Sequence, residues 1–294
     1  MSELSIDTVC DVSADLGEGP YWDAESKTLL WVDIWAGLLH RTDTVTGDTQ
    51  TTDAGAPTSL VLPAAGGGVV LARNSELILL DATGGERVIA STADPEGIRF
   101  NDGSVDPDGR VFVGSMDNEE KDALGQLYRL EPDGTLAALV TLVTISNGIA
   151  WSPSGDLMYY VDSPTKRIDV FTYHPAVGGL ADRRQLADMS DAVGVPDGLT
   201  VDAEGYVWVA DNGGGALRRY APSGVLDAVL PLPVSKPTSC AFGGDGLREL
   251  FISTARRGLS DAELEAQPLA GRLLRFTPGV AGLPATTTQA VISG

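Results

Sequence analysis

The chain has 294 residues, 43% of them hydrophobic, so it can bury a large core as two domains or as one large all-β unit. A formal net charge of −21 argues against binding to a phosphate backbone, which needs clustered Lys and Arg. The same charge argues against an anionic membrane surface, so we expect neither nucleic acid nor a membrane as a partner.

The first residues, MSELSIDTVCDVSADLGEGP, lack the basic start, apolar core and cleavage site of a signal peptide. No apolar run approaches the roughly 20 residues that a membrane span requires. Cys10 and Cys240 are far apart and show no CxxC spacing, so we expect neither a zinc–thiolate site nor a disulfide. A soluble cytoplasmic protein is expected.

One pattern recurs six times: an apolar strand, a tight turn of Asp, Ser, Pro or Gly, and a second apolar strand. The copies are residues 21–33, 61–73, 105–115, 151–163, 201–211 and 242–254. The turn residues favour hairpins because they tolerate positive φ or form local side-chain hydrogen bonds. The spacing of about 40–50 residues is typical of a propeller blade and is too long for a solenoid coil.

Each period also contains a segment of alternating apolar and polar residues that ends in Gly or Pro. These segments are 38–47, 77–85, 126–134, 167–175, 216–224 and 272–279. The alternation predicts outer, half-exposed strands. Only 260–265 (SDAELE) predicts a helix, with Ser260 as its N-cap.

These elements predict an all-β fold, a six-bladed β-propeller with four-stranded antiparallel blades around a central channel. Closure of the ring removes exposed sheet edges. We expect one domain over residues 1–294, with segment 4–12 pairing into the last blade and closing the ring.

A short polar or Gly-marked turn precedes the first strand of each repeat, and four of these turns carry an oxygen ligand at the same register. The six residues at this position are Glu18, Thr58, Asn101, Asn147, Asp197 and Thr238. If the repeats close in a ring, these side chains meet on its axis. The carboxylate, amide and carboxylate of Glu18, Asn147 and Asp197 suit a hard divalent cation. The alternative is that each residue caps a turn, since Asn-Gly and Asp-Gly are common turn dipeptides.

Further polar residues flank this set. Arg99 precedes Asn101 by two residues, so in an extended segment both point to the same face. Arg99 is either a structural ion-pair partner or a fork for substrate oxygens. Asn101 is either a fourth ligand or a donor to substrate, and Asp102 is expected to be structural. In GSMDNEE, either Glu119 or Glu120 reaches the pocket, or both lie on a solvated loop.

Other familiar sites are absent from the sequence. The two histidines, His40 and His174, lie in the predicted outer strands, which disfavours a Ser-His-Asp triad. No helix follows the glycine runs 66–68 and 213–215, so neither predicts a nucleotide-binding loop.

Several motifs occur in a fixed order through nearly the whole chain. They are LGEGPYWD, WVDIWAGLLHR, RFNDGSVDPDGRVFVGSM, SNGIAWSPSGDLMYYVDS, VPDGLTVDAEGYVWVA, and PTSCAFGG with FISTARRGLS. In this ordered set the chain resembles the SMP-30/gluconolactonase/regucalcin-like family of six-bladed propellers.

This resemblance implies one divalent cation (Ca²⁺, Zn²⁺, Mg²⁺ or Mn²⁺) in the channel, bound by Glu18, Asn147 and Asp197. It implies that Arg99 and Asn101 contact substrate, that Glu119 sits near it, and that the activity is that of a sugar lactone lactonase. The chain departs from the family at Trp35, Ile145, Ser146, Asp211 and Asn212, which leaves the metal set intact but bears on the identity of the substrate.

The expected reaction is metal-assisted hydrolysis of a small-molecule lactone, with Asp197 as the catalytic base that accepts a proton from the attacking water. We expect a monomer or a weak dimer. One alternative is an organophosphate or aryl-ester hydrolase that uses the same metal. The other is a non-catalytic propeller that binds Ca²⁺ or serves as an interaction platform.

Overall fold

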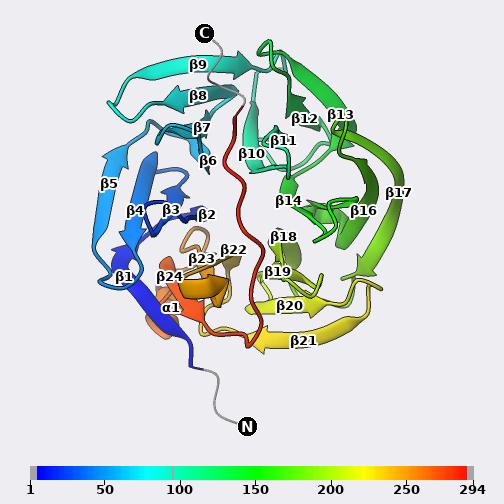
Figure 1. The fold of residues 1–294 in the computed structure, drawn as a ribbon. Coiled ribbons are helices and arrows are strands. Elements are labelled where there is room, and N and C mark those ends of the chain that lie inside the picture. The colour runs from blue at the N-terminus through cyan, green and yellow to red at the C-terminus, as the bar shows by residue number, and fades with distance from the viewer. Residues whose placement is uncertain (1–4, 95, 290–294) are drawn as a thin grey trace.

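The computed structural model of the protein describes residues 5–94 and 96–289. In this part of the chain, twenty-four strands form six antiparallel sheets of four strands each. The sheets stand radially around a common centre as the blades of a propeller (Figure 1). The predicted all-β, six-bladed β-propeller is therefore confirmed.

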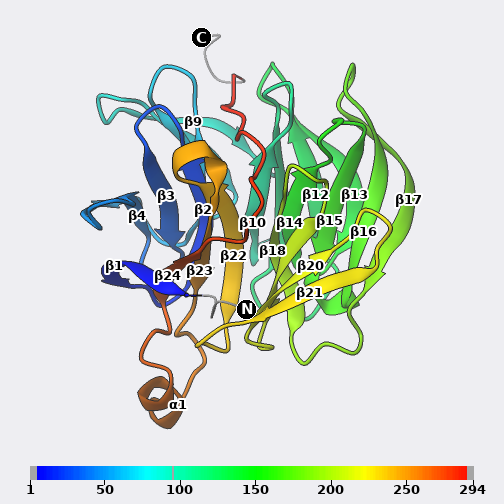
Figure 2. The ribbon, with the colours of Figure 1, turned by 60° about the horizontal axis from the view of Figure 1, so that its bottom comes forward.

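The strands of each blade are given from the axis outward. Blade one is β2 (Gly17–Asp23), β3 (Thr28–Asp33), β4 (Leu38–Asp43) and β5 (Thr49–Asp53), and blade two is β6 (Thr58–Pro63), β7 (Val69–Arg73), β8 (Glu76–Leu80) and β9 (Glu86–Ser91). Blade three is β10 (Ile98–Val105), β11 (Val111–Asp117), β12 (Gly125–Leu130) and β13 (Leu136–Val143), and blade four is β14 (Ser146–Trp151), β15 (Leu157–Asp162), β16 (Arg167–His174) and β17 (Gly179–Asp188). Blade five is β18 (Val195–Val201), β19 (Val207–Asn212), β20 (Ala216–Tyr220) and β21 (Leu226–Pro231), and blade six is β22 (Pro237–Gly243), β23 (Glu249–Thr254), β24 (Arg272–Phe276) and β1 (Asp7–Ser13). Figure 2 shows the first strands of the blades gathered around the axis.

The outermost strand of blade six comes from the beginning of the chain. β1 pairs antiparallel with β24, with Asp7 opposite Arg275 and Thr8 opposite Leu274. Val9 of β1 is buried in a cluster that also contains Trp31 of blade one. Of the segment 4–12 that was expected to pair here, residue 4 lies outside the described residues.

The segments predicted to be outer strands are instead the third strands: β4, β8, β12, β16, β20 and β24. They are more buried than their alternation indicates; His40 on β4, for example, is only 2% exposed. The reason is that each third strand still lies between two neighbouring blades. The fourth strands take the exposed position, as β21 shows with four exposed residues in succession.

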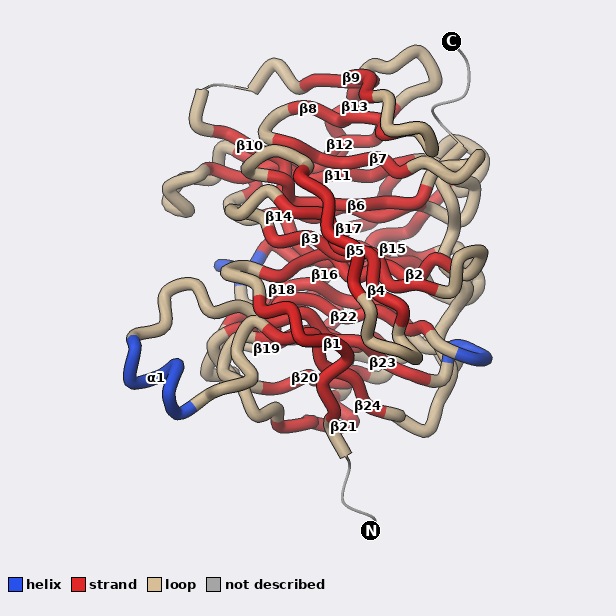
Figure 3. The backbone as a smooth tube through the Cα atoms, turned by 90° about the vertical axis from the view of Figure 1, so that its left-hand side faces the viewer, coloured by secondary structure: helices blue, strands red, loops and turns tan. Residues whose placement is uncertain are grey.

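The only α-helix among the described residues, α1 (Asp261–Ala266), lies between β23 and β24. The Ser260 side chain accepts a hydrogen bond from the Glu263 backbone N–H, and the Glu263 carboxylate accepts one from the Ser260 backbone N–H. The predicted helix is therefore confirmed, and it projects from one end of the ring (Figure 3). No helix in the described ranges has the length and apolar character needed to cross a membrane.

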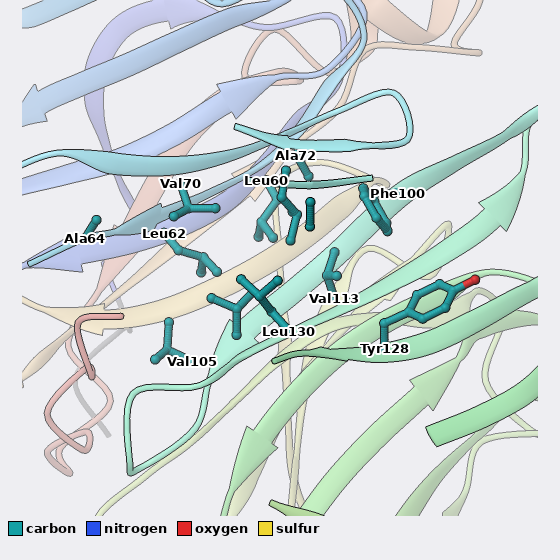
Figure 4. Packing of buried hydrophobic residues seen from close by; sticks show 13 residues of the cluster. Leu60, Leu62, Ala64, Val70, Ala72, Phe100, Val105, Val113, Tyr128 and Leu130 are labelled. Carbon is teal, nitrogen blue, oxygen red and sulfur yellow. The ribbon is translucent and has the colours of Figure 1, made fainter. Parts of the chain in front are cut away.

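The core consists of apolar clusters between adjacent blades. In the cluster of Figure 4, Leu60 and Leu62 of β6 and Val70 of β7 pack with Phe100 of β10 and Val113 of β11. Because both faces of a blade are covered in this way, strands near the axis carry continuous apolar runs such as VVLA in β7. Burial on this scale, at about 25 cal/mol per Å² of apolar surface, holds the inner strands in fixed positions around the channel.

The C-terminal segment 280–289, red in Figure 1, runs across the centre of the ring. Gly282 forms a bridge with Asp202 at the end of β18, and Thr288 forms one with Ala64 at the end of β6. The Thr288 hydroxyl also donates to the Gly109 carbonyl at 3.0 Å. The segment therefore covers the channel end at which the first and second strands of the blades are joined. The loops that follow the second strands lie at the opposite end of the channel.

Candidate metal centre

The six residues at the matched register lie in the first strands of the blades and not in turns. Each of these strands has an irregular register with its neighbour at that point: the shift falls between Glu18 and Tyr21 in β2, Ser146 and Ile149 in β14, and Pro196 and Leu199 in β18. β6, β10 and β22 show the same feature. A bulge re-aims a side chain that regular alternation would direct elsewhere. The interpretation of these residues as turn caps is therefore wrong.

The glycine after two of the candidate ligands is required by close packing around the channel. A Cβ on Gly148 would lie 2.7 Å from the Leu199 nitrogen and 2.8 Å from the Asp197 carbonyl oxygen. A Cβ on Gly198 would lie 2.1 Å from Ser239 Oγ. The Asn-Gly and Asp-Gly pairs thus allow neighbouring inner strands to approach each other and bring their polar side chains together.

A chain of hydrogen bonds orients the amides on the axis. Arg99 Nη1 donates to Asn101 Oδ1 at 2.7 Å, and Asn101 Nδ2 donates to Asn147 Oδ1 at 3.1 Å. Asn147 Nδ2 in turn donates to Ser163 Oγ at 2.8 Å. Arg99, Asn101 and Asn147 are buried. The network fixes the Asn147 oxygen toward the channel and leaves it a second lone pair for a ligand.

Two carboxyl groups share this space with few partners. Glu18 Oε2 accepts a hydrogen bond from the Gly19 nitrogen at 2.9 Å, and Asp197 Oδ2 accepts one from Asn212 Nδ2 at 2.7 Å. Burial raises the pKa of Glu18 well above its usual value, and the charge of Asp197 raises it further. Burial likewise raises the pKa of Asp197. The donors of these two bonds are neutral, and the charge of Arg99 lowers the pKa of Glu18 by less than burial and the neighbouring acids raise it.

Asp102 adds a third acid to the same region. Burial raises the pKa of its carboxyl to about 6, although the Gly103 nitrogen donates to it at 2.7 Å. Its charge raises the pKa of both Glu18 and Asp197. Asp102 also lines a cavity of about 420 Å³ between the candidate ligands and the C-terminal segment, which Ile149, Leu199 and Thr286 border as well. The sequence predicts only a structural role for Asp102, so it does not indicate this effect of Asp102 on the pKa of the two neighbouring carboxyl groups.

The donor set fits a divalent cation. No three His, Cys, Asp or Glu side chains gather as a metal-binding group in the described part of the chain. The candidate set contains only two such residues, Glu18 and Asp197, and the amide oxygen of Asn147 completes it. Hard oxygen donors with two negative charges are the chemistry that Ca²⁺, Mg²⁺ and Mn²⁺ prefer. A dication there would offset the buried charge of the two carboxylates.

The two threonines at the matched register have other partners. The Thr238 hydroxyl donates to the Gly17 carbonyl at 2.6 Å, which ties blade six to blade one. The Thr58 hydroxyl donates to the Ala54 carbonyl at 3.3 Å, in the segment that joins blade one to blade two. The channel is therefore asymmetric. Four blades present carboxylate or amide side chains at this position, and the other two present threonine hydroxyls that are hydrogen-bonded to backbone carbonyls.

The structure does not bring Glu119 into this group. Its side chain is 73% exposed and pairs with Lys121 at 2.9 Å. Burial lowers the pKa of Arg99 to about 10, and the charge of Glu120 is the first effect that opposes this. Glu120 has a left-handed backbone with φ 58° just after β11. Of the two glutamates, Glu120 is therefore the one whose charge affects Arg99. Strand alternation cannot predict the turn in which Glu120 lies.

Sequence reasoning missed three further residues near the site. Asn212, noted only as a departure from the family pattern, holds Asp197. Trp35, a second departure from the family pattern, lies in the turn after β3. The Arg99 Cζ atom is 5.6 Å from the Trp35 ring centroid, and that of Arg257 is 4.8 Å from it. The unusual size of Trp35 at its position in DIWAG was the one available signal.

Comparisons with known proteins identify the family of this chain. The family model described as SMP-30/Gluconolactonase/LRE-like region matches residues 16–256. Regucalcin from Bos taurus is 36% identical over 293 residues, which cover 97% of this chain and 98% of the relative. The calcium-binding protein regucalcin from Agrobacterium tumefaciens superimposes with a TM-score of 0.92 at 27% identity, over 97% of this chain and 98% of that one. A luciferin-regenerating enzyme superimposes with a TM-score of 0.91 at 27% identity, over 98% and 100%. The chain belongs to the SMP-30/gluconolactonase/LRE-like family.

Proposed function

We propose that this chain is a divalent-metal-dependent hydrolase that opens the ester of a sugar lactone. The observation that carries the proposal is the pair formed by half-buried Glu18 and buried Asp197 beside the oriented amide of Asn147. The family description includes gluconolactonase, and one similar structure is that of a calcium-binding protein. Both support a metal-dependent lactonase.

Glu18, Asn147 and Asp197 would hold the cation. When bound, a divalent cation supplies Lewis acidity toward the lactone carbonyl. Asp197 accepts the proton of the attacking water, and the Asn212 amide, which donates to its Oδ2, holds the carboxylate in place. The water oxygen bonds to the carbonyl carbon, the ring C–O bond breaks, and the proton passes to the departing ring oxygen. The product is a hydroxy acid, which ionises and releases a proton to the solvent.

Arg99 and Asn101 would position the sugar. Arg99 is 4% exposed and uses Nη1 for the Asn101 amide and for the Phe100 carbonyl, at 2.8 Å. Its Nε is buried without a hydrogen-bond partner among the described residues, which leaves a donor for a substrate oxygen. Hydrogen bonds in such a buried site are stronger than in water because the local dielectric constant is low.

A pH-stat assay tests the proposal. EDTA-stripped protein is supplied with Ca²⁺, Mg²⁺, Mn²⁺ or Zn²⁺ and a panel of aldonolactones, with paraoxon-type esters in parallel. We expect lactone hydrolysis that requires a dication and that Asp197→Ala lowers by about a thousandfold or more. Asp188→Ala, which removes an exposed carboxylate on β17, is the matched control and should retain activity.

Lactone turnover that survives EDTA or Asp197→Ala would contradict the mechanism. Metal-dependent hydrolysis of the phosphate esters without lactone hydrolysis would support the organophosphate alternative and overturn the proposed substrate. Binding of metal with no turnover of any ester would support the non-catalytic alternative.

A further inference from the structure

Trp35, Arg99 and Arg257 form a cluster that we call the arginine–indole clamp. Trp35 lies in the loop after β3, and Arg257 follows β23, so both come from loops that follow second strands. Arg99 lies opposite Met116 near the end of β11, another second strand. The clamp is therefore at the same end of the channel as Glu18 and Asp197, and away from the C-terminal segment.

Two guanidinium groups contact a single indole ring in the clamp. Arg99 Cζ lies 5.6 Å and Arg257 Cζ 4.8 Å from the ring centroid, both within the range of a cation–π interaction. Burial lowers the pKa of Arg99, the charges of Glu120 and Glu18 oppose this, and the charge of Arg257 acts in the same direction as burial. Two positive charges therefore meet at one ring, in a chain whose net charge is −21.

The inner cation of the clamp makes its hydrogen bonds with neutral groups. Arg99 donates to the Phe100 carbonyl and to the Asn101 amide, and neither acceptor is charged. Its Nε is buried with no hydrogen-bond partner in the described ranges. A buried polar group without a partner is costly, so its presence indicates a ligand that supplies one.

The outer cation is held so that its head remains accessible. The Arg257 side chain is 51% exposed and pairs with Asp15 at 2.9 Å. Lys236 Nζ donates to the Arg257 carbonyl at 2.8 Å, which fixes the loop. An ion pair this exposed is weak, so Arg257 can exchange Asp15 for another anion at little cost. Glu120, Glu18 and Asp15 are the acids that face the clamp.

The chemistry of two convergent guanidinium groups indicates the missing ligand. Arg forms planar, two-point hydrogen bonds with carboxylate and phosphate groups, and stacking on an indole holds the guanidinium plane in place. A neutral sugar presents only hydroxyl groups, which offer neither a planar pair of acceptor oxygens nor a negative charge. An anionic carboxylate or phosphate between Arg99 and Arg257 offers both.

We propose that the arginine–indole clamp binds an anionic group of the substrate, so that the preferred lactone carries a carboxylate or phosphate remote from its ester. This inference rests on the proposed lactonase function. Trp35 and Arg257 are then specificity residues, and they distinguish anionic sugar lactones from neutral ones.

The test compares matched lactones with the metal-loaded protein. Galactono-1,4-lactone and galactaro-1,4-lactone differ only in a hydroxymethyl or carboxylate at C6, and a 6-phosphorylated aldonolactone forms the third arm. We expect kcat/KM to be higher for an anionic lactone than for the neutral one by about tenfold or more, and this ratio to fall with added NaCl. Arg257→Gln should lower the ratio by about tenfold, and Arg257→Lys by less because it keeps the charge.

Arg256→Gln is the matched control, since it removes an exposed cation from the same loop, and the Arg256 side chain reaches Ser13 instead of Trp35. Thermal melts of all variants establish that they are folded. Preference for the carboxylate or for the phosphate lactone, lost in Arg257→Gln and kept in Arg256→Gln, supports the clamp and identifies its anion. Hydrolysis of all three lactones with equal ratios in wild type and Arg257→Gln would overturn the clamp and leave the lactonase intact. Hydrolysis of none of them, nor of any aldonolactone, would overturn the lactonase itself.

Discussion

Asn101 Nδ2 lies 3.1 Å from Asn147 Oδ1 and 2.9 Å from the Ser146 carbonyl oxygen, so two hydrogen bonds from one amide join blade three to blade four at the channel. Asn101 also accepts a hydrogen bond from Arg99, the proposed substrate-binding residue, and so links it to Asn147, the proposed metal ligand. The orientation of the proposed ligand oxygen therefore depends on a residue that is itself proposed to contact substrate. This coupling is the basis for reading the cluster as one site.

Asp197→Asn should stabilise the metal-free protein while it abolishes turnover. At pH 8 the buried Asp197 carboxylate lies close to Glu18 and Asp102 and has a neutral hydrogen-bond donor, so its charge disfavours the folded state. The asparagine removes the charge and keeps the shape. We expect Tm in EDTA to rise by about 2–8 °C, or roughly 1–2 kcal/mol for a chain of this size. A lower Tm in EDTA would contradict the uncompensated charge.

Gly198→Ala should destabilise the protein and impair the site. The new Cβ would meet Ser239 Oγ at 2.1 Å and Ser239 Cβ at 2.4 Å, between blades five and six. Overpacking of this kind costs about 1–3 kcal/mol, and relief of the clash would displace the adjacent Asp197. Gly179→Ala is the control, because its nearest neighbour would be Val177 Cγ2 at an ordinary 3.4 Å. Equal urea midpoints for the two variants would argue against tight packing at the bulge.

Removal of residues 1–12 should sharply lower the melting temperature. Without most of β1, strand β24 becomes an exposed edge, and the cluster containing Trp31 and Phe251 loses Val9 and Cys10. We expect Tm to fall by about 10 °C or more in circular dichroism. An unchanged melt would show that pairing of this segment contributes nothing to closure of the ring.

His40 should make the protein less stable in mild acid. Burial lowers the pKa of its imidazole below the usual value, although the charge of Asp33 opposes this, and Nε2 has no hydrogen-bond partner among the described residues. Because the folded-state pKa is the lower one, the unfolded chain binds the proton more readily. The stability contributed by neutral His40 is full above the unfolded pKa of about 6.5 and is lost as pH falls below it.

The measurement is the urea midpoint at pH 7.5 and at pH 5.5 for wild type and His40→Gln. The variant keeps a hydrogen-bonding group opposite the Thr51 hydroxyl, which lies 2.9 Å from His40 Nδ1, but removes the titration. We expect the loss between the two pH values to be smaller in the variant. An equal loss would assign the acid sensitivity to other groups.

The ring was predictable because turn chemistry and strand length recur along the chain. The position of each strand within its blade was harder to predict from the sequence. The apolar and polar alternation of 38–47 indicates a half-exposed strand, yet β4 lies between neighbouring blades and buries His40. Alternation reports which face of a strand is apolar, and it does not report how many strands lie further out.

The candidate ligands were predictable from their register, but their backbone was not. Asn-Gly at 147–148 has the composition of a turn and lies in β14, because the glycine provides space for Leu199 and not a bend. The contributions of Glu120, Trp35 and Arg257 come from loops whose backbone turns depend on tertiary contacts. No periodic pattern encodes such positions.

The most direct test of the account is calorimetric titration of a divalent cation into EDTA-stripped protein, for wild type, Glu18→Gln and Asp197→Asn. We expect one binding site per chain in the wild type, with affinity for the cation reduced by about a hundredfold or more in each variant. Asp188→Asn should bind as the wild type does. Equal stoichiometry and affinity in all four proteins would contradict the assignment of Glu18 and Asp197 to the metal, and with it the proposed mechanism.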